Sequence, residues 1–212
     1  MLDFGCDILI STAPLVRELA SDDTAELQFV HGPIEAHPPV GFEEFFGVGP
    51  YYRFIKANES GKGESDVLER IRNFPPGETA EDQMRELMRG GLPSVPTPEN
   101  CNNDSAADAM DYLYDIMEKD GPFDGIIGYS EGATVAATLI LHEQRKYEMT
   151  GIPPMFKCAL FFAGWPPMNP EFNSIVLSDE SDLTIEIPTI HISKLRSPNF
   201  CSRLLILHSR FA

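Results

Sequence analysis

The stretch "FDGIIGYSEGATVAATLI", residues 123–140, decides how the fold of this chain is interpreted. A short apolar run ends at Gly128, and a run rich in small and apolar residues begins directly after Ser130. A strand that turns sharply into a helix around Gly-x-Ser-x-Gly is the pattern of a nucleophile elbow, in which the serine stands exposed at the turn. The stretch therefore predicts a strand, a tight turn and a helix, with Ser130 as a candidate nucleophile.

The serine motif also has a plainer interpretation. Gly-x-Ser-x-Gly alone is a weak signal in a chain with 16 glycines. Ser130 could equally be the N-cap of a helix that follows a strand in any α/β protein. The flanking residues meet both structural conditions of the elbow, and this favours the nucleophile. In that role, the backbone N–H of Glu131 at the helix N-terminus would stabilise an oxyanion.

Apolar runs alternate with helical periodicity on both sides of the motif. Residues 105–117 carry apolar side chains at helical spacing, with Ser105 as the expected N-cap and Gly121 at the end. Further strands are expected in "FKCALFFAG" (156–164), "IPTIHIS" (187–193) and "RLLILHS" (203–209). Alternating helices and buried strands predict an α/β fold whose mostly parallel sheet is flanked by helices.

The N-terminal part of the chain is less regular. Apolar spacing in residues 13–19 predicts a first amphipathic helix, and "AELQFVHGP" (25–33) is expected to form a short strand. Residues 41–104 hold many Gly and Pro residues and a long polar run. An insertion of this kind is typical of either a functional lid or a disordered segment. We therefore expect a single domain over residues 1–212 with an irregular, lid-like insertion at about 41–104.

Charge and cysteine content limit the classes of partner. The chain has 33 acidic and 16 basic side chains, giving a formal net charge of -17. Such a surface repels nucleic-acid phosphates and anionic lipids, so we expect neither nucleic-acid binding nor membrane association. The four cysteines lack the spacing of a zinc site or a disulfide framework. No secretory signal is recognisable, and these features together favour a cytoplasmic protein without a metal.

Several stretches together resemble the fungal serine hydrolases of the α/β-hydrolase superfamily. That group includes the polyketide-releasing thioesterase of the lovastatin pathway and esterases of fungal biosynthetic gene clusters. The resemblance is carried by "VHGPIEAHPPVGFEEFFGVGPYYRF" (30–54), "GYSEGA" (128–133), "FKCALFFAGWPP" (156–167) and "IPTIHI" (187–192). It implies cofactor-free hydrolysis of a small acyl or polyketide ester or thioester by a Ser-His-Asp triad. The implied partner is a small acyl substrate, which an acyl carrier of a polyketide synthase could hold.

The same resemblance implies residues that this chain does not show. The family has a strand and a His-Gly loop, the source of a second oxyanion donor, ahead of the region matched by residues 5–15. At the position of the triad acid it has Asp-Pro, where this chain has Ser197-Pro198. His208 is the candidate base by its late place in the chain, but it is more similar to a non-catalytic histidine of the family. We therefore expect a sequence that is incomplete at both ends, or a divergent copy.

Two classes of function follow from these observations. The first is a serine esterase or thioesterase of fungal secondary metabolism. The second is a catalytically inactive relative that binds a partner or an acyl ligand in the same pocket. Replacement of a triad acid commonly lowers turnover by about 10⁴-fold, so slow or absent ester hydrolysis is expected. Of the other histidines, His142 is expected to face solvent, and His191 is expected to be a core histidine in the middle of a strand.

Overall fold

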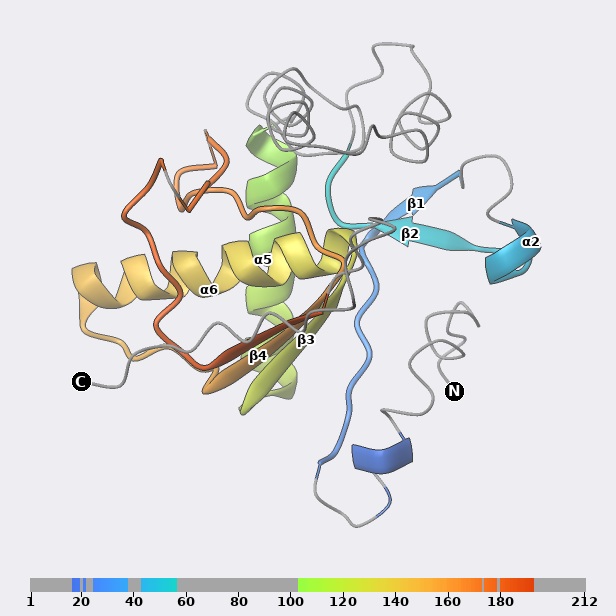
Figure 1. The fold of residues 1–212 in the computed structure, drawn as a ribbon, viewed down its shortest axis with the longest axis horizontal. Helices are drawn as coiled ribbons and strands as arrows, with labels where there is room; N and C mark the ends of the chain where they lie inside the picture. The colour runs from blue at the N-terminus through green and yellow to red at the C-terminus, as the bar shows by residue number, and fades with distance from the viewer. Residues whose placement is uncertain are drawn as a thin grey trace, which may run out of the picture. The chain divides into compact units, whose positions relative to one another are not determined.

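The computed structural model describes residues 17–19, 21, 25–37, 43–56, 103–172, 174–178 and 180–192 (Figure 1). The chain divides into two compact units, Met1–Arg53 and Phe54–Ala212. Most of the expected insertion at about 41–104 lies outside the described residues, so its lid-like character stays a prediction. In the described part of the chain, none of the helices combines the length and the apolar character needed to cross a membrane.

The first unit contains a small antiparallel sheet. Strand β1 (Ile34–Ala36) pairs with β2 (Tyr51–Arg53), and the short helix α2 (Glu43–Phe46) lies between them in the chain. Residues 25–33 form no strand, so the expectation of a strand there is wrong. Their alternating exposure is strand-like, but β2 pairs with residues 34–36 instead, and a strand requires a paired neighbour. Of the predicted first helix, residues 17–19 are described and are helical.

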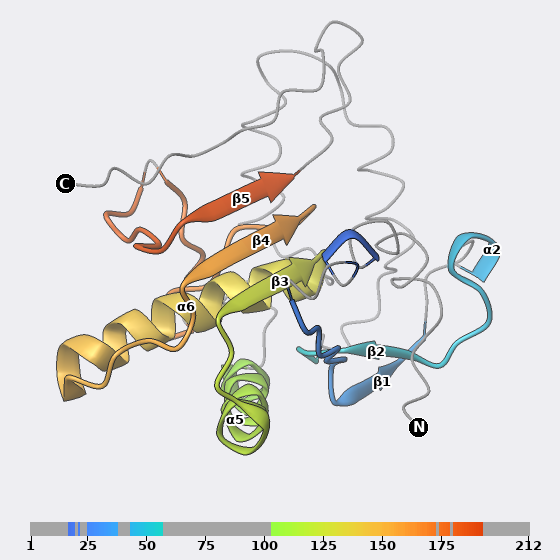
Figure 2. The ribbon, with the colours of Figure 1, turned by 90° about the horizontal axis from the view of Figure 1, so that it is seen from below.

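The described residues of the second unit form a parallel sheet of three strands in the order β3-β4-β5 (Figure 2). Its elements follow in the chain as α5 (Asn103–Asp120), β3 (Gly125–Tyr129), α6 (Glu131–Thr150), β4 (Cys158–Phe162) and β5 (Thr189–Ile192). The strands expected around "GII", "CALFF" and "TIHI" are therefore confirmed, and so is the α/β fold class. The strand expected at residues 203–209 lies outside the described residues.

The start of α5 differs from the sequence-based expectation. The helix begins at Asn103, so Ser105 lies inside its first turn and is not the N-cap. The Ser105 hydroxyl accepts a hydrogen bond from the backbone N–H of Lys56, with 2.7 Å between Oγ and N. This long-range acceptor role accounts for a buried serine at that point. The helix ends before Gly121 as expected, and the Gly121 N–H donates to the Met117 carbonyl oxygen.

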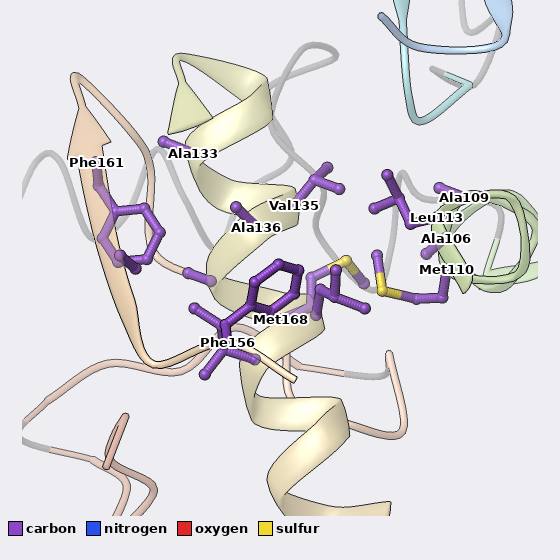
Figure 3. Packing of buried hydrophobic residues seen from close by; sticks show 14 of the residues in the cluster. Ala106, Ala109, Met110, Leu113, Ala133, Val135, Ala136, Phe156, Phe161 and Met168 are labelled. Atoms are coloured by element: carbon purple, nitrogen blue, oxygen red, sulfur yellow. The ribbon is translucent and has the colours of Figure 1, made fainter. Parts of the chain in front are cut away.

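Helix α6 covers one face of the sheet and forms the centre of the hydrophobic core. Phe161 of β4 points toward the helix, where Ala133 and Ala136 leave room for its ring (Figure 3). On the other side of α6, Val135 points toward Leu113 of α5 (Figure 3). The small residues early in α6 thus allow a close approach to the sheet, which brings the start of α6 close to the carboxyl ends of β3 and β4.

The opposite face of the sheet is also apolar. The ladder pairs Ile127 of β3 with Leu160 of β4, and Leu160 with Ile190 of β5. Ile127 is 43% exposed and Ile190 is 47% exposed. In the described part of this unit, α6 covers one face of the sheet, and the other face presents a row of aliphatic side chains.

Candidate active site

Ser130 occupies the turn between β3 and α6, as the sequence predicts. Its backbone has φ 53° and ψ −120°, in the left-handed half of φ space that residues with a side chain rarely adopt. The Ser130 N–H donates to the carbonyl oxygen of Phe162, with 2.8 Å between the atoms. Such a conformation persists only where the surrounding structure enforces it, and it is common at functional sites.

The two glycines of the motif have different surroundings. A β-carbon on Gly128 would lie 2.4 Å from Ala133 Cα and 2.7 Å from the Gly132 carbonyl oxygen. No side chain fits there, because the atoms that it would meet belong to the backbone. A β-carbon on Gly132 would meet only Phe54 Cε2, at an ordinary distance of 3.8 Å. Gly128 is therefore required by the turn, whereas Gly132 has space for a side chain.

The conformation of Ser130 argues against the plainer interpretation as a helix N-cap. A capping serine usually has β-region backbone angles, and its hydroxyl accepts a hydrogen bond from the first turn of the helix. Ser130 has neither those angles nor a capping hydrogen bond from its side chain, and it is exposed. Its hydroxyl is thus available at the surface of the turn, and this favours the nucleophile.

The residue expected to donate to an oxyanion, Glu131, lies at the start of α6. The N–H groups of Ala133 and Thr134 both donate to the Ser130 carbonyl oxygen, at 3.0 and 3.4 Å. Glu131 precedes these residues and is the first residue of α6. The positive end of the helix dipole lies at the same place. The Glu131 N–H is therefore suited to an oxyanion that forms at Ser130, although this role stays a prediction.

The loop after β4 is joined to α6 next to this turn. The hydroxyl of Thr134 donates to the Trp165 carbonyl oxygen and accepts from the Trp165 N–H, both at 3.0 Å. Thr138 accepts from the Met168 N–H, also at 3.0 Å. A β-carbon on Gly164 would lie 2.6 Å from Ala133 Cβ, so only glycine allows this approach. The carboxyl end of β4 and the start of α6 are thus held together as one support for Ser130.

The side chain of Glu131 makes a contact that the sequence does not reveal. Its Oε2 accepts a hydrogen bond from the backbone N–H of Phe54 at 2.8 Å. The two residues are 77 positions apart, and no local pattern connects them.

Two histidines of this unit are described, and neither is placed to act as the base. His142 lies in α6 twelve residues after Ser130, about 18 Å along the helix axis. His191 lies in β5, two strands from β3, or about 10 Å across the sheet. The His191 ring packs against Phe161, with 5.0 Å between ring centroids.

The expectation that His142 faces solvent is wrong. Its Nδ1 lies 3.0 Å from the Tyr114 hydroxyl, and its ring stacks on Phe172 with 5.6 Å between centroids. Burial lowers the pKa of His142, and the nearby Lys146 lowers it further. Tyr114 of α5 packs beside His142 of α6 and covers it in part. The sequence of α6 alone contains no sign of this contact, because α5 is a separate element.

The remaining site predictions concern residues outside the described part of the chain. These are His208, the candidate base, and Ser197, at the position of the triad acid. Both stay predictions, as does the resemblance-based second oxyanion donor.

Cys158, at the start of β4, is a free and exposed thiol.

Comparison with known proteins places the chain in a family. The family described as Serine hydrolase (FSH1), of the α/β-hydrolase type, matches residues 11–193. The hydrolase phiM of Talaromyces stipitatus is 24% identical over 180 residues, which are 84% of this chain and 57% of that protein. The esterase FUS5 of Gibberella moniliformis is 27% identical over 183 residues, 85% of this chain and 57% of the relative.

A third relative matches over a shorter segment. The esterase alnB of Emericella nidulans is 36% identical over 110 residues, which are 48% of this chain and 37% of that esterase. The chain therefore spans little more than half the length of phiM and FUS5, and its match spans 37% of alnB. No solved structure matches it. Since the family match covers most of the sequence and includes the Ser130 turn, the chain belongs to the Serine hydrolase (FSH1) family.

Proposed function

We propose that this protein is a serine esterase or thioesterase that cleaves a small acyl or polyketide ester or thioester, with Ser130 as the nucleophile. The observation that carries the proposal is the exposed Ser130 at φ 53°, fixed by the hydrogen bond from its N–H to Phe162. Relatives named hydrolase and esterase support the reaction class. The acyl class and a role in fungal secondary metabolism rest on the resemblance to biosynthetic-cluster esterases.

The chemistry follows from the geometry of the turn. Ser130 Oγ would attack the carbonyl carbon of the acyl group and lose its proton to a base, forming a tetrahedral oxyanion. The Glu131 N–H would donate to that oxyanion. Collapse of the intermediate would release an alcohol or a thiol, which takes up the proton, and leave the acyl group on Ser130. Water would then cleave the acyl-enzyme by the same steps. None of these steps requires a cofactor or a metal.

The identity of the base and the acid follows only from family resemblance. His208 and the acid position at Ser197 are the candidates, and a serine cannot stabilise an imidazolium by charge as an aspartate does. The proposed partner is the acyl substrate itself, free or held on an acyl carrier. The net charge of -17 supports a protein that binds neither nucleic acid nor anionic membrane.

Labelling with a fluorophosphonate tests the proposal, because this probe reacts with activated serine hydroxyls. We expect the wild-type protein to be labelled at Ser130, as read by mass spectrometry of the peptide, and Ser130→Ala to be unlabelled. Ser178→Ala is the matched control, since Ser178 is also exposed but lies outside the turn. Labelling that is absent from the wild type, or unchanged in Ser130→Ala, would support the inactive, ligand-binding relative instead.

A further inference from the structure

The segment Phe54–Lys56 is fixed at both ends by hydrogen bonds to the starts of two helices. At one end the Phe54 N–H donates to Glu131 Oε2 at 2.8 Å, and at the other the Lys56 N–H donates to Ser105 Oγ at 2.7 Å. Ile55, between them, is 5% exposed and belongs to the hydrophobic core. The segment is therefore held in place beside the first turn of α6.

The aromatic ring of Phe54 faces that turn. A β-carbon on Gly132, the second residue after Ser130, would be 3.8 Å from Phe54 Cε2, so the ring edge and Gly132 leave room for about one methyl group between them. Phe54 is partly buried and packs against the core. An acyl group attached to Ser130 Oγ starts from the same turn. The partly buried Phe54 ring is thus an apolar surface facing the turn from which an acyl chain would begin.

Glu131 is an unexpected residue at this position. Its backbone N–H is the proposed oxyanion donor, and a carboxylate so close to a developing negative charge opposes that charge. A carboxylate also accepts stronger hydrogen bonds from backbone N–H groups than a neutral oxygen does. The hydrogen bond from the Phe54 N–H is a favourable interaction of the Glu131 carboxylate, and it offsets the unfavourable effect of the carboxylate charge on the oxyanion.

We propose that Glu131 is a positioning residue whose carboxylate holds Phe54 as an apolar wall for the acyl chain of the substrate. This inference rests on the proposed function and deepens it, because it assigns an acyl-chain contact to the same site. It implies a preference for acyl groups with an extended apolar chain over acetyl groups. The alternative is that the Glu131 charge only interacts favourably with the helix dipole at the N-terminus of α6, and the variants below separate the two roles.

Three variants test the proposal. Glu131→Gln keeps an oxygen that can accept the Phe54 N–H but removes the charge. Glu131→Asp keeps the charge at the helix N-terminus but is one methylene too short to reach Phe54. Glu143→Ala is the matched control, because Glu143 is buried in α6 and its Oε2 accepts the Met155 N–H at 3.3 Å, well away from Ser130.

Steady-state hydrolysis of p-nitrophenyl octanoate and p-nitrophenyl acetate gives the first readout. Glu131→Asp should raise the KM for octanoate by about tenfold relative to acetate, with little change in kcat, because the lost contact acts on binding. Glu131→Gln and Glu143→Ala should keep the wild-type ratio of the two KM values. An unchanged ratio in Glu131→Asp, or an equal change in Glu131→Gln, would overturn the inference.

A second readout does not depend on catalysis. Exchange of the Phe54 backbone amide should be faster in Glu131→Asp than in the wild type and Glu131→Gln, and calorimetric affinity for octanoate should fall in the same variant. If the wild type lacks Ser130-dependent turnover but shows both effects, the proposed reaction fails and the positioning role holds. Equal amide exchange in all forms, or no binding of octanoate by the wild type, would refute the positioning role itself.

Discussion

The backbone N–H of Ser130 and the carbonyl oxygen of Phe162 are joined by a hydrogen bond of 2.8 Å. Tyr129 is the register partner of Phe162 in the β3–β4 ladder, so this bond continues the ladder by one step beyond the last strand residue. The sheet therefore holds the backbone of Ser130 while the side chain stays exposed. The reactivity of Ser130 should depend on the few contacts that maintain this turn.

The first of these contacts is the close approach at Gly128. Gly128→Ala would place a methyl group 2.4 Å from Ala133 Cα, and the backbone would have to shift to accommodate it. We expect a loss of about 1–3 kcal/mol in the free energy of unfolding, as for an overpacked core site. Urea denaturation measures this change, and fluorophosphonate labelling of Ser130 should slow in the same variant.

Gly132→Ala is the matched control for that prediction. Its methyl group would meet only the Phe54 ring at 3.8 Å, and alanine is a better helix former than glycine by up to about 1 kcal/mol. We therefore expect this variant to be as stable as the wild type or slightly more so. Equal destabilisation by both substitutions would show that the turn does not have the geometry described.

A second prediction concerns the loop after β4. Thr134→Val removes the hydroxyl that accepts from the Trp165 N–H and donates to its carbonyl oxygen. An unsatisfied buried group of this kind costs roughly 1–3 kcal/mol, so the free energy of unfolding should fall by that amount. Labelling of Ser130 should also slow, because the loop and the first turn of α6 lose their connection.

Thr150→Val serves as the control for the Thr134 substitution. Thr150 lies at the other end of α6 and is exposed, and its hydroxyl donates to the Lys146 carbonyl oxygen and accepts from the Ile152 N–H, where water can replace both partners. Its substitution should change the free energy of unfolding by less than about 0.5 kcal/mol. If Thr150→Val is as destabilising as Thr134→Val in urea denaturation, the effect comes from helix propensity and the loop contact is unimportant.

The sequence predicts the centre of this unit well because its signals are local. The glycines around Ser130, the apolar run of β4 and the periodicity of α6 each lie within about 20 residues, and each element forms where expected. The tight turn at Gly128 follows from the same short stretch. Short sequence patterns are enough to predict this part of the fold, because the strand, the turn and the helix follow one another directly in the chain.

The parts that sequence reasoning missed depend on distant partners. Glu131 is hydrogen-bonded to Phe54, which is 77 residues away in the sequence, and His142 is hydrogen-bonded to Tyr114, which is 28 residues away. Both contacts arise from how α5, α6 and the segment after β2 pack, which no window of a single sequence contains. The strand expected at residues 25–33 failed for a related reason, since pairing with β2 determines where the strand lies.

The third prediction concerns the pH dependence of stability. Burial and Lys146 lower the pKa of His142 from its ordinary value of 6.5, while the charges of Asp111 and Glu171 raise it by smaller amounts. The unfolded chain therefore takes up this proton more readily than the folded chain. The stabilising contribution is present above about pH 6.5 and is lost as the pH falls below it.

We therefore expect the free energy of unfolding to decrease between about pH 7.5 and about pH 5.5, and to decrease less steeply in His142→Gln. Burial likewise lowers the pKa of His191, so His191→Gln should show the same direction. Burial raises the pKa of Glu143, so the contribution of this residue to the free energy of unfolding decreases as the pH rises. Glu143 is present in the wild type and in both variants, so its contribution cancels when each variant is compared with the wild type. Parallel pH profiles for wild type and variants would contradict the assignment.

The last prediction concerns the position expected for the triad acid. Family resemblance puts Ser197 where an aspartate orients the catalytic histidine, and loss of that acid typically lowers turnover by about 10⁴-fold. Ser197→Asp should therefore raise kcat for a p-nitrophenyl ester by about tenfold or more, even if the new carboxylate is imperfectly placed. Neither His142 nor His191 is within reach of Ser130, so substitution of either should leave this gain intact.

Two double variants and one control complete the experiment. Ser130→Ala combined with Ser197→Asp should show no gain, because the nucleophile is absent. His208→Ala combined with Ser197→Asp should also show none if His208 is the base, whereas a retained gain would assign the base to another histidine. Ser178→Asp adds the same charge at an exposed serine and should leave turnover unchanged. If Ser197→Asp is no faster than Ser178→Asp, then position 197 is not the position of the acid.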